Sequence, residues 1–117
     1  MKINYQNEEY ELRLSMRALM LYENIAQESY SQGTLTASVN LFYAVLLAAQ
    51  YIKGNHSYND KQINYDEFID WVDENRDVYY EFSNWVKQQN EDQSNKSPKL
   101  KKNKNSDKEL SNEETPN

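Results

Sequence analysis

Apolar and polar residues alternate at the start of the chain. The apolar members of this alternation are Ile3, Tyr5, Tyr10, Leu12 and Leu14. A period of two is the pattern of β-strands with one buried face, so two short strands are expected, joined by a turn at Asn7-Glu8. A lone hairpin is only marginally stable in water, and this one must therefore pack on the elements that follow it.

A helical period follows the hairpin. Ser15 is a residue type that caps helices, and Leu14 and Leu19 have the spacing of a hydrophobic staple around that cap. The helix is expected to run from Met16 to about Gln27. Its apolar residues form a stripe wide enough to contact more than one neighbour, and the polar interval after it is expected to be a loop.

The longest apolar segment predicts a second helix, with Thr36 as its cap and Gly54 as its terminator. Apolar residues occur on nearly every side of this helix. A small domain cannot fully surround such a helix, so it is either the central one or has a face that meets a partner. Its most apolar part, residues 41–52, is shorter than the about 20 residues of a membrane helix, and no membrane span is expected.

Two further helices are expected after a loop. Asn64 and Glu67 have the spacing of a capping box, and Ile63 and Phe68 have the spacing of a staple. This third helix is expected to break near residues 74–75. The last helix places its apolar residues along one side, at Val78, Phe82, Trp85 and Val86.

The periodic pattern stops near Glu91. Residues 92–117 contain only two aliphatic side chains, Leu100 and Leu110, in a background of Lys, Asn, Ser, Asp and Glu. Such a composition cannot bury enough apolar surface to fold. We therefore expect a mainly α protein in which an N-terminal β-hairpin packs on a small four-helix domain, residues 1–90, and a disordered charged tail or linker, residues 91–117.

Charge and composition exclude several classes of function. Residues 1–90 hold seven basic and thirteen acidic side chains, whereas residues 91–117 hold six of each, so the net charge of −6 lies on the folded part. An acidic surface repels phosphate backbones, and no nucleic-acid partner is expected. Without cysteine there is no disulfide or thiolate metal site.

Residues that could act in catalysis or bind phosphate are also few. His56 is the only histidine, and Gly33 and Gly54 are the only glycines, which leaves no catalytic constellation and no phosphate-binding loop. The acidic residues between Asp66 and Asp77 do not have the spacing of a calcium loop and are interpreted as a solvated helix face. We expect no catalytic residue, no metal, no cofactor and no enzymatic activity.

Ten tyrosines and two tryptophans are many for a chain of 117 residues. Some of them must fill the core, as expected for Tyr22, Tyr43, Phe68 and Trp85. Others can form a contact patch, because aromatic side chains dominate the energetics of protein interfaces. The candidate protein-binding residues from these considerations are Leu46, Leu47, Tyr51, Trp71, Tyr79 and Trp85.

The segment from Met16 to Ile25 (MRALMLYENI), placed after a short hairpin, resembles the tail assembly chaperones of long-tailed bacteriophages and prophages. The later acidic segment from Tyr65 to Asp73 (YDEFIDWVD) is similar to a short helix near the end of that family's domain. The resemblance covers roughly residues 1–88. The long charged tail and the very apolar second helix depart from the family pattern, and the latter is compatible with self-association.

The resemblance implies a helical protein that binds the tape measure protein, keeps it soluble and recruits tail tube subunits to it. Such a protein acts in the cytoplasm of the bacterial host and is absent from the mature virion. The family often adds a second domain by a programmed ribosomal frameshift. The tail suits a linker to such a domain, and Lys101-Lys102 would fit a slippery coding sequence.

Two other classes remain open on the sequence. A small acidic adaptor or inhibitor of one host or phage partner would share the acidity and the lack of catalytic groups. A structural virion protein, such as a connector subunit, would also share them. An adaptor would bind one partner stoichiometrically, and a connector would be present in purified particles.

Overall fold

A computed structural model describes residues 1–31 and 33–96 of the chain. The chain divides into two units, Met1–Val86 and Lys87–Asn117. The described part is mainly helical and begins with a two-stranded antiparallel hairpin, which confirms the expected fold class. The charged tail is expected to be disordered. From residue 97 on, its positions lie outside the described residues.

The hairpin consists of β1 (Lys2–Tyr5) and β2 (Glu8–Glu11), with Tyr5 paired to Glu8. Its turn residues are Gln6 and Asn7, whose φ angles are 50° and 67°. Two left-handed residues are what the tightest hairpin turns require, because their twist matches that of the strands. The turn thus lies one residue earlier than the expected Asn7-Glu8.

The first helix, α1, spans Met16–Ala26 and has the cap expected from the sequence. Ser15 Oγ accepts a hydrogen bond from the Ala18 N–H at 3.2 Å. The helix ends at Gln27, which adopts the left-handed conformation with φ 62°. Both boundaries confirm the expected helix, since its capping signals are local in sequence.

The second helix, α2, spans Leu35–Lys53 and begins two residues before the expected position. Its cap is Thr34, whose Oγ1 accepts a hydrogen bond from the Ala37 N–H at 3.0 Å. Thr36 lies inside the first turn of α2, so the expectation that it caps the helix is wrong. Two threonines of identical chemistry flank Leu35, and only the backbone conformation distinguishes their roles.

Replacing Thr34 with alanine is therefore expected to lower the free energy of unfolding by about 1 kcal/mol, because the cap of α2 is lost. The matched variant Thr36→Ala is expected to change it by less than about 0.5 kcal/mol, since Thr36 is an exposed surface position. Urea denaturation followed by circular dichroism measures both values. Equal losses in the two variants would mean that Thr34 does not cap the helix.

Gly54 ends α2 because a side chain does not fit at this position. Its φ is −83°, a value open to any residue. A Cβ atom at this position would lie 2.0 Å from the backbone oxygen of Ser57. Glycine is needed here because the following loop folds back against the end of the helix.

The third and fourth helices, α3 (Tyr65–Glu74) and α4 (Arg76–Lys96), are separated by Asn75. Asn64 Oδ1 accepts a hydrogen bond from the Glu67 N–H at 2.9 Å, which confirms the expected cap of α3. The helical conformation of α4 continues six residues beyond the expected domain end at residue 90. Polar residues such as Gln, Glu and Lys form helices readily, so the helix outlasts its apolar pattern.

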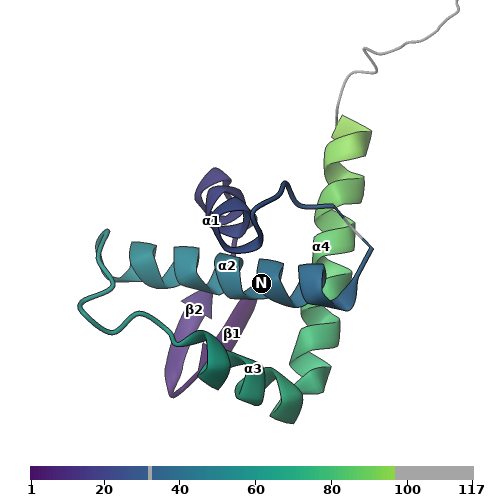
Figure 1. The fold of residues 1–117 in the computed structure, drawn as a ribbon. Helices are drawn as coiled ribbons and strands as arrows, with labels where there is room; N and C mark the ends of the chain where they lie inside the picture. Colours follow the sequence, from purple (N-terminus) through teal and green to yellow (C-terminus); the bar gives the residue numbers. More distant parts are fainter. Residues whose placement is uncertain (32, 97–117) are drawn as a thin grey trace, which may run out of the picture. The chain divides into compact units, whose positions relative to one another are not determined.

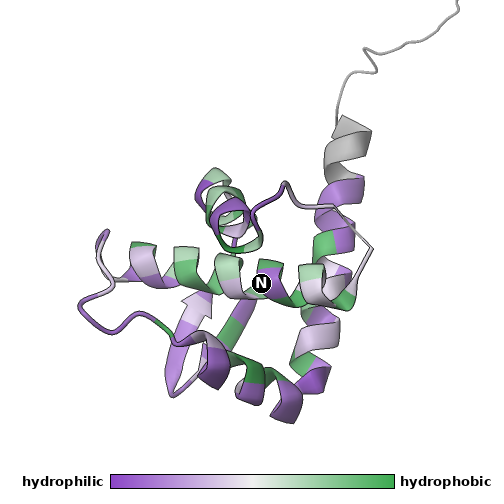
Figure 2. Cartoon of the chain, in the orientation of Figure 1, coloured by the Kyte–Doolittle hydropathy of each residue, from purple (hydrophilic) through white to green (hydrophobic). Residues whose placement is uncertain are grey.

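The core of the first unit is built around the middle of α2, where every residue from 41 to 48 is buried. In Figure 1, α2 lies between α1 on one side and the hairpin with α3 on the other. Figure 2 shows hydrophobic residues along α2 and hydrophilic residues in the loop that follows it. Phe42 is the centre of this core: its ring stacks on Phe82 at a centroid distance of 4.2 Å and meets the edge of Phe68 at 5.2 Å.

By length and composition alone, the 19-residue helix α2 is long and apolar enough to cross a membrane. The same properties are found in the central helix of a folded domain. The eight consecutive buried residues of α2 are covered by other elements of this fold, and this burial accounts for its apolar composition.

Candidate functional site

Two of the six candidate contact residues lie in the core. Leu46 and Leu47 are 0% and 2% exposed, so a partner has no access to either side chain in this fold. The expectation that they contact a client is therefore corrected. An apolar helix can be central or can face a partner, and the structure shows that this part of α2 is central.

The other four candidates are half-buried aromatic residues that do not form one cluster. Trp71 packs its ring against Tyr5 at 5.1 Å, and Trp85 packs against Phe82 at 5.8 Å. Tyr79 contacts the neighbouring ring of Tyr80. Tyr51 is the fourth. The described residues show no ring contact between any two of these four side chains, although each keeps some surface that a partner can reach.

The most exposed apolar side chains were not among the candidates. The largest exposed fractions are those of Met16 (73%), Leu35 (69%), Met20 and Tyr80 (60% each) and Ile52 (54%). Met16 and Met20 lie one turn apart on α1, and Ile52 lies near the end of α2. Exposed residues of this size in a small domain mark contact surfaces when they gather together. The wide apolar stripe of residues 16–27 was visible in the sequence and could have indicated exposed residues on α1. In the fold, neighbouring elements cover only part of that stripe.

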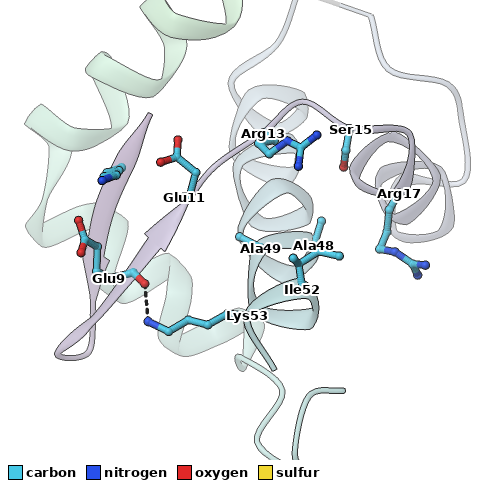
Figure 3. Close-up of a pocket in the computed structure, with 10 residues that line it drawn as sticks. Glu9, Glu11, Arg13, Ser15, Arg17, Ala48, Ala49, Ile52 and Lys53 are labelled. Carbon is cyan, nitrogen blue, oxygen red and sulfur yellow. Dashed lines mark hydrogen bonds between the residues drawn. The ribbon is translucent and has the colours of Figure 1, made fainter. Parts of the chain in front are cut away.

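A groove lined by Ile52 lies between the hairpin, α1 and α2 (Figure 3). The second half of α2 forms its floor, with Ala48, Ala49 and Ile52, while the hairpin forms one wall and the start of α1 the other. Its volume is about 560 Å³. Met20 follows Arg17 of this wall by three residues, and residues at this spacing are neighbours on a helix surface. The exposed apolar surface of α1 is thus next to the groove.

Charged side chains surround the apolar floor. Four basic residues line the groove, Lys2, Arg13, Arg17 and Lys53, together with Glu9 and Glu11. These four are more than half of the seven basic residues found in residues 1–90. The groove is therefore the place where the positive charge of an acidic domain is concentrated.

The ion pairs near the groove leave its two arginines unpaired with carboxylates. The Lys53 ammonium lies 3.0 Å from a carboxylate oxygen of Glu8, and the N-terminal ammonium lies 3.1 Å from Glu11. Neither Arg13 nor Arg17 has a carboxylate within 4.0 Å among the residues described here. The Arg17 guanidinium instead lies over the ring of Tyr51, 4.4 Å from its centroid.

A second hollow of about 580 Å³ lies between the hairpin turn and the loop that connects α2 to α3. Its lining is mostly polar, with several Gln, Asn, Glu and Lys side chains. The hydroxyl of Tyr5, which also lines it, is buried and has no hydrogen-bond partner among the described residues. Burial raises the pKa of this hydroxyl to about 12, and the nearby Glu67 carboxylate adds to the effect.

The groups that could support catalysis or metal binding are dispersed. His56 lies exposed in the loop after α2, with its ring against Tyr51. The acidic residues of α3 are exposed, and Asp73 pairs with Arg76 at 2.7 Å. Within residues 1–31 and 33–96 no group of three His, Asp or Glu side chains is arranged to hold a metal ion.

Comparison of this chain with models of known protein families, with curated proteins and with solved structures finds no match.

Proposed function

We propose that this protein is a tail assembly chaperone of a long-tailed phage or prophage, which binds the tape measure protein, keeps it soluble and recruits tail tube subunits. The resemblance of residues 16–25 and 65–73 to that family supports the proposal. The structural observation that supports it most is the groove over α2, whose apolar floor includes the exposed side chain of Ile52.

A chaperone for a long helical client needs a surface that accepts varied apolar side chains. Methionine suits this task because its side chain is flexible and polarizable and adapts to different partners. A groove with apolar residues at its base accepts the apolar face of an amphipathic helix. Ile52 in the groove and the exposed methionines of α1, Met16 and Met20, are apolar side chains that such a client could contact.

The net charge of the domain serves the same function. A complex of this protein with an apolar client stays soluble if the exposed side of the chaperone carries excess charge, and residues 1–90 carry −6. The chaperone would act in the bacterial cytoplasm and leave before the tail is complete. We therefore expect it to be absent from purified virions, whereas a connector subunit would be present in them.

Co-expression with the tape measure protein of the same locus tests the proposal. The tape measure protein is expected to become soluble and to co-purify with several copies of this chain. A tape measure protein that stays insoluble and unbound beside the folded chain would contradict the proposal. Capture of a different single partner at one-to-one stoichiometry would favour an adaptor or inhibitor.

A matched pair of variants locates the contact. Ile52→Ser removes an exposed apolar side chain from the groove, and Leu35→Ser removes one at the opposite end of α2, outside the groove lining. Loss of an isoleucine contact costs about 1.5–3 kcal/mol of binding, or roughly a tenfold or greater loss of affinity. Ile52→Ser is expected to reduce the co-purified tape measure protein strongly, and Leu35→Ser to leave it unchanged.

A further inference from the structure

We infer that the groove over α2 binds an acidic amphipathic helix, whose apolar face lies on Ala49 and Ile52 and whose carboxylates pair with Arg13 and Arg17. This inference rests on the proposed function, because it names the kind of segment that the client would present. It also stands as a statement about the groove, since it derives from the charges and side chains that line it.

The distribution of charge identifies the sign of the occupant. The groove gathers four of seven basic residues in a domain that is otherwise strongly acidic. Lys53 is already paired with Glu8, and Glu11 with the N-terminal ammonium. Lys2, Arg13 and Arg17 have no carboxylate partner among the described residues, and of these the two arginines can hold a carboxylate through two N–H donors. A partner with carboxylates beside its apolar residues complements this rim, whereas a basic partner is repelled by it.

The position of Arg17 prepares it for a carboxylate. Its guanidinium lies over the ring of Tyr51. This cation–π contact uses the flat face of the guanidinium and holds the charged group in place. The N–H donors of a guanidinium lie in its plane and remain open along its edge. They match both oxygens of a carboxylate, which makes arginine better suited than lysine to this contact.

The floor of the groove indicates a helix as the form of the occupant. Ala48 and Ala49 are small, so a partner backbone can approach α2 closely, and Ile52 stands one turn further along. The floor residues span less than two helical turns of α2, or about 8 Å. Two turns of a client helix, with apolar residues three or four positions apart and carboxylates flanking them, would cover this length.

A phosphate backbone is a poorer occupant for this groove. Glu9 and Glu11 belong to the same rim, and the surrounding surface of the domain is acidic, so a long polyanion would be repelled beyond the two arginines. A short peptide places its carboxylates only where the arginines are. The mixed charge of the rim thus favours a peptide with spaced acidic residues.

The test uses the full chain and two synthetic helical peptides of 18 residues labelled with fluorescein. One peptide contains leucine along one face and glutamate on its flanks, and the other replaces every glutamate with lysine. Fluorescence anisotropy is expected to show at least about tenfold tighter binding of the glutamate peptide. Its affinity is expected to fall as salt is raised from 50 to 500 mM, because exposed ion pairs are screened.

Three charge-reversal variants locate the contact. Arg13→Glu and Arg17→Glu are each expected to weaken binding of the glutamate peptide about tenfold. Arg76→Glu is the matched control, since Arg76 is exposed and pairs with Asp73 outside the groove lining. Glutamate is favourable in the first turn of a helix, so Arg17→Glu is expected to fold, and circular dichroism checks this.

Equal binding of the two peptides, or unchanged binding by both groove variants, would overturn the inference. Sedimentation of the wild-type chain as a dimer that Arg17→Glu dissociates would also overturn it, because a second copy would then fill the groove. If binding of the glutamate peptide depends on the arginines but the tape measure protein stays insoluble on co-expression, the inference about the groove is supported and the proposed function is refuted. If the Arg17→Glu variant solubilises the tape measure protein as well as the wild-type chain does, the proposed function stands and the inference about the groove is refuted.

Discussion

Replacing Phe42 with alanine is expected to lower the free energy of unfolding by about 3–5 kcal/mol, the cost of removing a buried phenylalanine. Phe42 is fully buried, and its ring joins α2 to α4 through Phe82 and to α3 through Phe68. The 86 residues of the first unit would have about 4–13 kcal/mol of total stability at typical values per residue. The variant therefore loses a large part of what holds the domain together.

Urea unfolding followed by tryptophan fluorescence measures this loss, because Trp71 packs near Phe42 and reports on the core. Met20→Ala is the matched control. It removes a large apolar side chain from a helix position that is exposed, and its effect is expected to stay within about 0.5 kcal/mol. A Phe42→Ala variant as stable as this control would show that the aromatic core does not form as described.

Raising the pH from 10 to 12 is expected to unfold the domain progressively. The Tyr5 hydroxyl has its pKa raised from the ordinary value of 10.0 to about 12, with burial as the largest cause. Between these values the folded state keeps a proton that the unfolded state releases. Stability is therefore full below pH 10 and is lost as the pH rises through 12, by at most about 3 kcal/mol for Tyr5 alone.

Other tyrosines act in the same direction. Burial raises the pKa values of five further hydroxyls, those of Tyr10, Tyr22, Tyr30, Tyr43 and Tyr58. Each of them adds to the preference of the folded state for the protonated form. Circular dichroism at a series of pH values, with urea unfolding at each, measures the combined effect.

Tyr5→Phe separates the contribution of this residue. The Tyr5 hydroxyl has no hydrogen-bond partner among the described residues, so its removal is expected to stabilise the domain by about 1 kcal/mol at pH 7. The variant is also expected to lose less stability than wild type between pH 10 and 12. A variant that is destabilised at pH 7, with the same alkaline dependence as wild type, would mean that the hydroxyl is satisfied in solution.

The elements of the fold follow from local signals. Ser15 and Asn64 cap the helices expected after them, and Asn75 separates the last two helices where the break was expected. These features depend on residues within one turn of each other, so the sequence contains the relevant chemistry. Where two neighbouring residues had the same chemistry, as Thr34 and Thr36 do, the backbone decided between them.

The sequence by itself determined the helical class, the hairpin, the acidic charge and the scarcity of residue types for catalysis. Tertiary structure alone decided which apolar residues remain at the surface. Leu46 and Leu47 became core because neighbouring elements cover α2, whereas Met16, Met20 and Ile52 stayed exposed. An apolar stripe records only that burial is favourable, and the arrangement of neighbouring elements decides whether the same chain or a partner provides it.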